Sequence, residues 1–278
     1  MYALDFLYTF IYKHSIPRNK VSYILSQKMK NIDYIFLGSS RVDNFIDSEI
    51  IKNVTGKSAL NLGFQAAKLD DYYFILRLLQ EQKITSRIVF IQIDYVYNLD
   101  GTSEILKSSL MPYIYDDLIA SYIKKRDKDF IKLKYLPFYR YMVYDYKLGF
   151  RELFNSFIQK KPRVNLANGY NPKYETAVEA LKSSFPAQII NENRTITQIN
   201  YFAEKNDIQI IYFTSPMCAN TKNLDYTSKL SSKLSQYLDF SQIFIDHDEY
   251  FFNCSHINDD GAKVFSEKFG DIIKNKYQ

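Results

Sequence analysis

The stretch Asp33-Tyr34-Ile35-Phe36-Leu37-Gly38-Ser39-Ser40-Arg41 decides the fold of this chain. Its four apolar residues, Tyr34 to Leu37, end abruptly at a glycine and two hydroxyl side chains. A short apolar run of this kind predicts a strand that is buried on both faces, and the turn after such a strand lies at the carboxyl edge of a parallel sheet. Two interpretations fit: a strand with an ordinary serine-rich turn, or a strand that delivers a reactive hydroxyl group to the sheet edge.

Four further apolar runs predict the rest of the sheet. They alternate with segments of helical periodicity, which indicates an α/β fold: a three-layer α/β/α sandwich around a five-stranded parallel sheet, with right-handed crossovers. The expected strands are residues 58–63, 88–93, 208–213 and 243–245, and the expected helices include residues 69–82, 191–205, 228–238 and a closing helix that starts near Asn258.

The length suits one domain that spans residues 1–278. Residues 1–30 predict an N-terminal helical segment, and residues 101–187 predict a helical, aromatic-rich insertion after the third strand. Because the insertion leaves the sheet at its carboxyl edge, we expect it to lie over that edge as a cap or substrate-binding wall. The alternative is that its helices pack as a satellite core.

The composition excludes several classes of protein. The net charge of +5 is spread along the chain without a basic stripe, so we expect no nucleic-acid partner. No Cys/His cluster has the spacing of metal ligands, so we expect neither a metal nor another cofactor. No run approaches the roughly 18 apolar residues of a membrane-spanning helix. Residues 1–12 come nearest, as the remainder of a longer anchor or as a helix packed on the domain. The 25 Tyr and 21 Phe suit a sugar-binding surface or a nucleotide-composition bias equally well.

A second block lies near the other end of the chain. Asn253-Cys254-Ser255-His256-Ile257-Asn258-Asp259-Asp260-Gly261 precedes the closing helix. Together the two blocks resemble the SGNH (GDSL-like) hydrolase superfamily, in the branch whose first block is Gly-Ser-Ser-Arg. In that branch a His is followed by Asn and Gly, as His256, Asn258 and Gly261 are here. The resemblance spans the strands and helices of nearly the whole chain and implies the strand order 2-1-3-4-5.

The resemblance implies a serine nucleophile and a histidine base. A serine hydroxyl needs a neighbouring imidazole to take its proton. We assign Ser40 as the nucleophile and His256 as the general base, with Ser39 as the runner-up nucleophile. Of the other histidines, His14 and His247 lack a matching context, and His247 could replace His256 only if its loop folds differently.

The family's third catalytic residue is replaced here. Relatives carry a carboxylate three residues before the His, and this chain has Asn253 there. Loss of that acid lowers the rate of a template triad by about 10⁴. Three outcomes stay open: a Ser–His pair oriented by Asn253, a substitute acid at Asp246 or Asp248, or a protein that is no longer catalytic.

Further site residues follow from position and resemblance. The oxyanion donors implied are the backbone N–H groups of Ser40 and Ala66 and the amide of Asn98, whereas Asp94 is expected to cap a turn. Cys218 and Cys254 are either free thiols or a disulfide that pins the loop of the base. Candidate substrate-binding residues are Tyr139, Tyr170 and Arg41, the last of which is also expected to brace its turn by an ion pair.

These expectations favour an acyl, specifically acetyl, esterase or O-acetyltransferase that acts on a carbohydrate hydroxyl through an acyl-enzyme. Its partners would be an acylated glycan and an acyl donor. The alternative is a non-catalytic carbohydrate-binding or polysaccharide-assembly protein that has lost the triad acid. The resemblance implies the cell envelope or the periplasmic face of a membrane, with an anchor before Met1 left open; a cytoplasmic location is the alternative.

Overall fold

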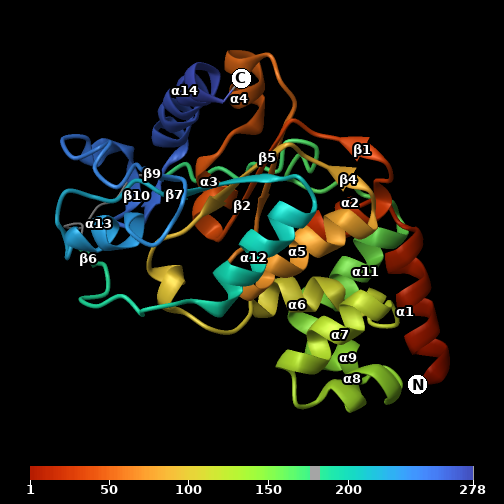
Figure 1. The fold of residues 1–278 in the computed structure, drawn as a ribbon. Helices are drawn as coiled ribbons and strands as arrows, with labels where there is room; N and C mark the ends of the chain where they lie inside the picture. The colour runs from red at the N-terminus through yellow and green to blue at the C-terminus, as the bar shows by residue number, and fades with distance from the viewer. Residues whose placement is uncertain (176–181, 278) are drawn as a thin grey trace.

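A computed structural model describes residues 1–175 and 182–277 and has a five-stranded, all-parallel sheet at its centre. The strand order β3-β2-β5-β7-β9 corresponds to 2-1-3-4-5 along the chain, as the resemblance implies. Figure 1 shows helices on both faces of this sheet, so the α/β/α sandwich is confirmed. The strands are β2 (Tyr34–Gly38), β3 (Ala59–Gly63), β5 (Ile88–Gln92), β7 (Gln209–Thr214) and β9 (Tyr237–Asp239).

Alternating residues of the central strand divide the core into two clusters. Ile35 and Leu37 of β2 join the cluster on the side of α5 and α12, whereas Phe36 packs with Phe90 and Phe269 on the side of α14. This division follows from the two-residue period of a strand with both faces covered. The helices concerned are α3 (Ser40–Phe45), α4 (Ser48–Thr55), α5 (Leu69–Glu81), α12 (Arg194–Lys205), α13 (Asp225–Ser231) and α14 (Asp259–Lys276).

The fifth strand is not where the sequence places it. It is β9 at Tyr237–Asp239, which overlaps the last two residues of the expected helix 228–238, and residues 243–245 lie in a series of turns. In that apolar run Phe244 is buried against Tyr250 and Phe251, whereas Ile245 is 43% exposed. A three-residue apolar run can bury one ring from a turn as well as form a strand, so periodicity does not separate the two.

The helical part of the insertion forms a layer outside α5. Tyr122 stacks on Phe74 of α5 with ring centroids 4.1 Å apart, and its hydroxyl group bonds to Asp71. These helices pack with the two N-terminal helices, and their buried side chains belong to the same cluster as Ile35 and Leu37 of the sheet, so they do not form a separate core. The loop 165–172 returns to the sheet edge, and the role of the insertion as a substrate-binding wall stays a prediction. The elements are α1 (Tyr2–His14), α2 (Lys20–Ser26), α6 (Glu104–Leu110), η2 (Met111–Tyr113), α7 (Asp117–Arg126), α8 (Phe130–Tyr135), α9 (Tyr139–Val143), α10 (Asp145–Leu148) and α11 (Phe150–Phe157).

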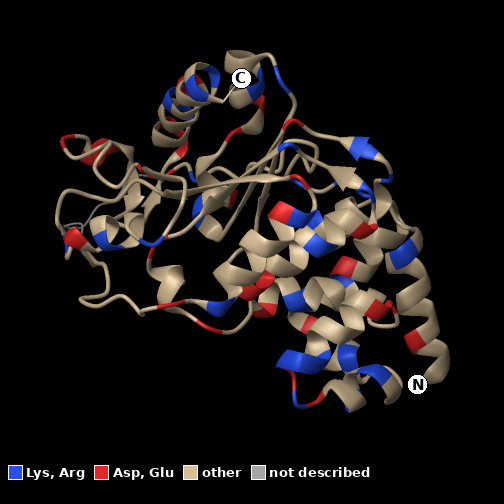
Figure 2. Ribbon diagram, viewed as in Figure 1, with Lys and Arg blue, Asp and Glu red and all other residues tan. Residues whose placement is uncertain are grey.

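Short elements complete the fold. Three two-stranded parallel or antiparallel ladders and two further 3-10 turns lie at the margins of the sheet: β1 (Lys30–Asn31) with β4 (Ile84–Thr85), β6 (Ser183–Ser184) with β8 (Thr221–Lys222), β10 (Phe251–Asn253) with β11 (His256–Ile257), η1 (Tyr95–Asn98) and η3 (Asp248–Tyr250). Acidic and basic residues are interspersed along the chain, as the ribbon in Figure 2 shows. Within the described residues, no helix combines the length and the apolar character needed to cross a membrane.

Candidate active site

Ser40 stands at the point where the central strand passes directly into a helix. β2 ends at Gly38, Ser39 is the N-cap of α3, and Ser40 is the first residue of that helix. A Cβ atom at Gly38 would lie 2.2 Å from Val42 Cγ2 and 2.8 Å from Gln92 Cβ, so the tight passage requires glycine. The turn therefore holds Ser40 at the carboxyl edge of the sheet, partly exposed.

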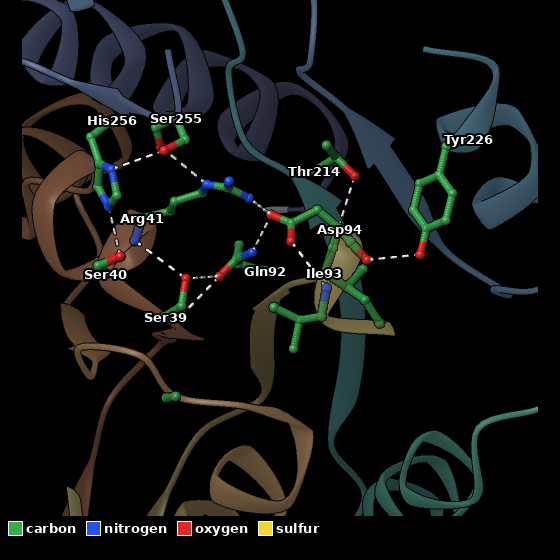
Figure 3. A network of polar contacts seen from close by, with 12 residues as sticks. Ser39, Ser40, Arg41, Gln92, Ile93, Asp94, Thr214, Tyr226, Ser255 and His256 are labelled. Carbon is green, nitrogen blue, oxygen red and sulfur yellow. Dashed lines mark hydrogen bonds and ion pairs between the residues drawn. The ribbon is translucent and has the colours of Figure 1, made fainter. Parts of the chain in front are cut away.

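His256 reaches Ser40 from the other end of the chain. Ser40 Oγ lies 2.7 Å from His256 Nε2, although 216 positions separate the two residues (Figure 3). A hydroxyl group and an imidazole nitrogen at this distance have the geometry of a nucleophile and its base. The structure therefore brings together the two residues that the sequence assigns to these roles, whereas Ser39 Oγ bonds to Gln92 instead.

Asn253 takes the position of the third catalytic residue. His256 Nδ1 lies 3.2 Å from Asn253 Oδ1 and 3.2 Å from Ser255 Oγ. With the proton on Nδ1, the ring donates to these oxygens and leaves Nε2 free to accept from Ser40. Asp246 and Asp248 are exposed, and neither bonds to His256, so the hypothesis of a substitute acid is wrong for both.

The electrostatic surroundings keep His256 neutral. Burial, the guanidinium group of Arg41 and the ammonium group of Lys173 lower the pKa of His256 from 6.5 to about 4, and Asp94 opposes the shift only in part. An imidazole with this pKa is unprotonated at neutral pH and can accept a proton. An imidazolium at this position would be poorly stabilised, because Asn253 carries no charge.

A buried network fixes the Ser40 turn from the neighbouring strand. The N–H group of Ser39 donates to Gln92 Oε1 at 2.9 Å, and Ser39 Oγ donates to the same atom at 2.8 Å. Gln92 Nε2 donates to Asp94, which forms an ion pair with Arg41 (Figure 3). Gln92 is the single polar interruption of an apolar strand, which is the sequence signal for this function.

Arg41 braces the site and is not placed to bind substrate. Its side chain is 3% exposed, pairs with Asp94, lies 4.7 Å from the ring centroid of Tyr95, and donates from Nε to the Ser255 carbonyl oxygen at 3.1 Å. The expected brace is therefore present, whereas the assignment of Arg41 to substrate binding is wrong. Asp94 also accepts from the N–H group of Val96, in keeping with its expected capping role.

Of the three expected oxyanion donors, two have no other hydrogen-bond partner among the described residues, and their role stays a prediction. In the described part of the chain, the N–H groups of Ser40 and Ala66 make no hydrogen bond, and Ala66 is exposed with φ 56°. Asn98 does not fit. Its amide donates to the carbonyl oxygen of Gln188 at 2.7 Å and accepts from Ile190, so it holds a neighbouring loop. The prediction for Asn98 is wrong because partners from a distant loop occupy it.

The two tyrosines expected to bind substrate have structural positions. Tyr139 lies on α9, which packs against α8 and α10 in the helical layer outside α5. Tyr170 is buried, and its hydroxyl group donates to Asp259 Oδ1 at 2.9 Å. The hydroxyl group of Tyr170 is therefore already paired within the fold, whereas Tyr139 is partly exposed, and its assignment to substrate binding stays a prediction.

Sequence reasoning missed a buried cation close to the site. Lys20 of α2 donates from Nζ to Asp43 Oδ1 at 2.7 Å, to Asn61 Oδ1 at 3.1 Å and to the Gly63 carbonyl oxygen at 2.7 Å. Burial lowers the pKa of Lys20, and Asp43 opposes this shift. Asp43 lies on α3 with Ser40, so this pair attaches the N-terminal helices to the helix that carries the nucleophile.

A disulfide joins the loops after the fourth and fifth strands of the sheet. Cys218 and Cys254 are bridged with their Cα atoms 4.9 Å apart, which settles the open question of free thiols in favour of the bridge. Cys254 lies between Asn253 and Ser255, so the disulfide attaches the segment that carries His256. Among residues 1–175 and 182–277, no group of three or more His, Cys, Asp or Glu side chains is arranged to hold a metal ion.

Comparisons with known proteins do not identify the family of this chain. No protein-family model matches the chain, and no curated protein matches it. One similar solved structure is that of a protein assigned to the G-D-S-L family of lipolytic proteins, from Desulfitobacterium hafniense DCB-2. It is 11% identical, covers 87% of this chain and 99% of that chain, and superposes with a TM-score of 0.37. Values this low carry no functional inference, so the proposals below depend on the residues of this chain.

Proposed function

We propose that this protein is a serine-dependent acyl esterase or O-acetyltransferase that acts on a carbohydrate hydroxyl through an acyl-enzyme. The observation that carries the proposal is the 2.7 Å contact of Ser40 Oγ with His256 Nε2, backed by Asn253 at Nδ1. Acetyl as the acyl group and a glycan as its carrier come from the resemblance of the two sequence blocks.

The first half-reaction acylates Ser40. Its oxygen attacks the ester carbonyl carbon, His256 Nε2 takes the hydroxyl proton, and the carbonyl oxygen becomes an oxyanion. The N–H groups of Ser40 and Ala66 are the donors available to that oxyanion. When the intermediate collapses, His256 returns the proton to the departing alcohol, and the acyl group stays on Ser40.

The second half-reaction needs only an acceptor hydroxyl. Water or a sugar hydroxyl gives its proton to His256 Nε2 and attacks the acyl carbon, and Ser40 is regenerated. Hydrolysis and transfer therefore share every residue of the site. Because Asn253 holds the ring without stabilising its positive charge, we expect turnover to be slow with a simple ester.

Hydrolysis of p-nitrophenyl acetate tests the proposal directly. We expect Ser40→Ala and His256→Ala to abolish the turnover of the wild-type chain. Two matched controls, Ser231→Ala and His247→Ala, replace exposed residues of the same types and should leave it unchanged. A fluorophosphonate probe should label Ser40 alone. Turnover that survives in both site variants would exclude this mechanism.

One observation favours a second candidate, a non-catalytic carbohydrate-binding protein. Asn253 and the cations that lower the pKa of His256 are the surroundings expected of a site that has lost its acid. Such a protein should ignore the fluorophosphonate and still be retained by immobilised glycan. For either candidate we propose an envelope location, which the Cys218–Cys254 disulfide supports because such bonds persist in oxidising compartments.

A further inference from the structure

The N-terminal helix exposes a row of aromatic rings. Tyr2, Phe6 and Phe10 follow one another at four-residue intervals on α1, so they lie on one side of the helix. Their side chains are 80%, 71% and 49% exposed, and the rings of Phe6 and Phe10 stack with centroids 6.1 Å apart. An exposed aromatic row of this length is unusual for a helix packed on a domain, which normally turns its apolar side to the core.

A neighbouring helix repeats the pattern. On α11, Phe150, Phe154 and Phe157 are 72%, 51% and 65% exposed, and the first two stack on each other. The core side of the same helix is formed by Leu153 and Ser156. α1 and α11 contact each other and lie side by side in Figure 1. We call the six rings, Tyr2, Phe6, Phe10, Phe150, Phe154 and Phe157, the aromatic face.

The fold does not need these rings. α1 packs on the domain through Tyr8 and Tyr12, whose rings contact Tyr141, and through an ion pair of Asp5 with Arg140. Large exposed aromatic side chains on two helices that contact each other indicate a surface that binds something. Aromatic rings of this kind suit a binding partner whose surface is the boundary between water and an apolar medium.

The charged residues near the aromatic face indicate what kind of surface it binds. Exposed cations lie near the aromatic face: four of them line a hollow together with Tyr12 of α1 and Phe150 of α11, and the fifth lies on α1. In the described part of the chain none of them has a carboxylate partner, whereas Glu152 is neutralised by Arg18. Asp145 is the one carboxylate of α10 and α11 left without an ion pair among the described residues. Positive charge is therefore in excess beside the rings. The cations are Lys13, Lys147, Arg151, Lys160 and Lys161.

We propose that the aromatic face docks on the surface of a bilayer that contains anionic lipids. The rings would lie at the level of the lipid headgroups, and the flanking cations would contact the lipid phosphates, as in helices that lie in a membrane interface. Most of α1 is uncharged in Figure 2, and its acidic residue, Asp5, pairs with Arg140 on the side that packs on the domain. In Figure 1, α1 and α11 lie well away from α3 and β10, so docking leaves Ser40 accessible.

Flotation with lipid vesicles tests this proposal. The wild-type chain should float with vesicles that combine phosphatidylcholine and phosphatidylglycerol, and binding should weaken with added salt and with phosphatidylcholine alone. Phe6→Glu combined with Phe154→Glu should lower binding at least about tenfold, because each change places a charge in the interface. The matched control is Tyr201→Glu on α12, whose ring is 67% exposed elsewhere.

Further variants and controls separate membrane binding from loss of folding and from dimer formation. Thermal unfolding and circular dichroism establish that each variant folds, independently of any esterase activity, so this test does not depend on the proposed function. Lys160→Glu combined with Lys161→Glu should remove the preference for phosphatidylglycerol. A wild-type chain that stays with the unbound fraction, or a double phenylalanine variant that binds like the wild type, overturns the proposal. A dimer in analytical ultracentrifugation that the phenylalanine variant dissociates would assign the face to a second copy instead.

Discussion

Ser40 and His256 meet from two regions that are built in different ways. The Ser40 turn continues a central strand and is fixed by buried side chains of the next strand, Gln92 and Asp94. The His256 loop lies beyond the edge strand β9, in a ladder of two short strands. The disulfide, a hydrogen bond from Arg41 and the buried side chains of Phe251 and Ile257 attach it to the rest. The buried side chains that fix the Ser40 turn are paired with one another, whereas the His256 loop has Asn253 where the related triads have an acid.

The largest expected effect comes from supplying that acid. Asn253→Asp should increase kcat for p-nitrophenyl acetate by up to about 10⁴-fold, the size of the loss that the reverse exchange causes in the template triad. A carboxylate at the same place accepts from Nδ1 and also stabilises the imidazolium.

Steady-state kinetics of Asn253→Asp beside Asn253→Ala check this prediction. The alanine variant, which lacks any acceptor at Nδ1, should fall below the wild type. If the aspartate variant is no faster, the slow step does not involve proton transfer to His256, and the difference between the two regions has no catalytic consequence.

The second effect is structural and belongs to the Ser40 turn. Asp94→Ala leaves the Arg41 charge buried without its partner, so the free energy of unfolding should fall by about 3–5 kcal/mol. Urea unfolding measures this loss. The control is Asp225→Ala, which breaks an exposed pair with Lys229 and should leave the free energy of unfolding nearly unchanged, because solvent screens such a pair. Equal losses in the two variants would show that the network does not stabilise the turn.

A feature of the fold or of the site could be predicted from the sequence when the residues that determine it lie close together in the chain. The apolar runs locate four of the five strands, because a central strand is specified by its own residues. The strand order and the roles expected of Ser40 and His256 come from the resemblance of the two sequence blocks. The position of β9 could not be predicted, since an edge strand with one neighbour needs only three residues. The partners of Asn98 and Lys20 come from remote loops and helices, and no local pattern identifies them.

The third effect weakens the His256 loop. Replacing Cys218 and Cys254 by alanine removes a bridge across 36 positions and should lower the free energy of unfolding by about 3–4 kcal/mol. Turnover should also decrease at temperatures where the chain stays folded, because Cys254 adjoins Asn253. Thermal unfolding and kinetics of the same preparation separate the two effects, and wild-type turnover in the double variant would mean that the bridge does not position the base.

The smallest effect is a displaced pH profile. Burial, Arg41 and Lys173 hold the pKa of His256 at about 4, below the ordinary 6.5, so the ring stays neutral as the pH falls through the usual range of an imidazole. The acid limb of kcat/KM should therefore lie near pH 4, with nearly constant values between neutral pH and about pH 5.

The same shift has a consequence for stability. Between pH 6.5 and about 4 the unfolded chain binds more protons at His256 than the folded chain, so the contribution of this group to stability decreases as the pH falls. Asn253→Asp should raise the pKa and move the limb of kcat/KM to higher pH. A wild-type limb near pH 6.5 would show that water reaches the ring, and the His256 loop would then be more open than the Ser40 turn it faces.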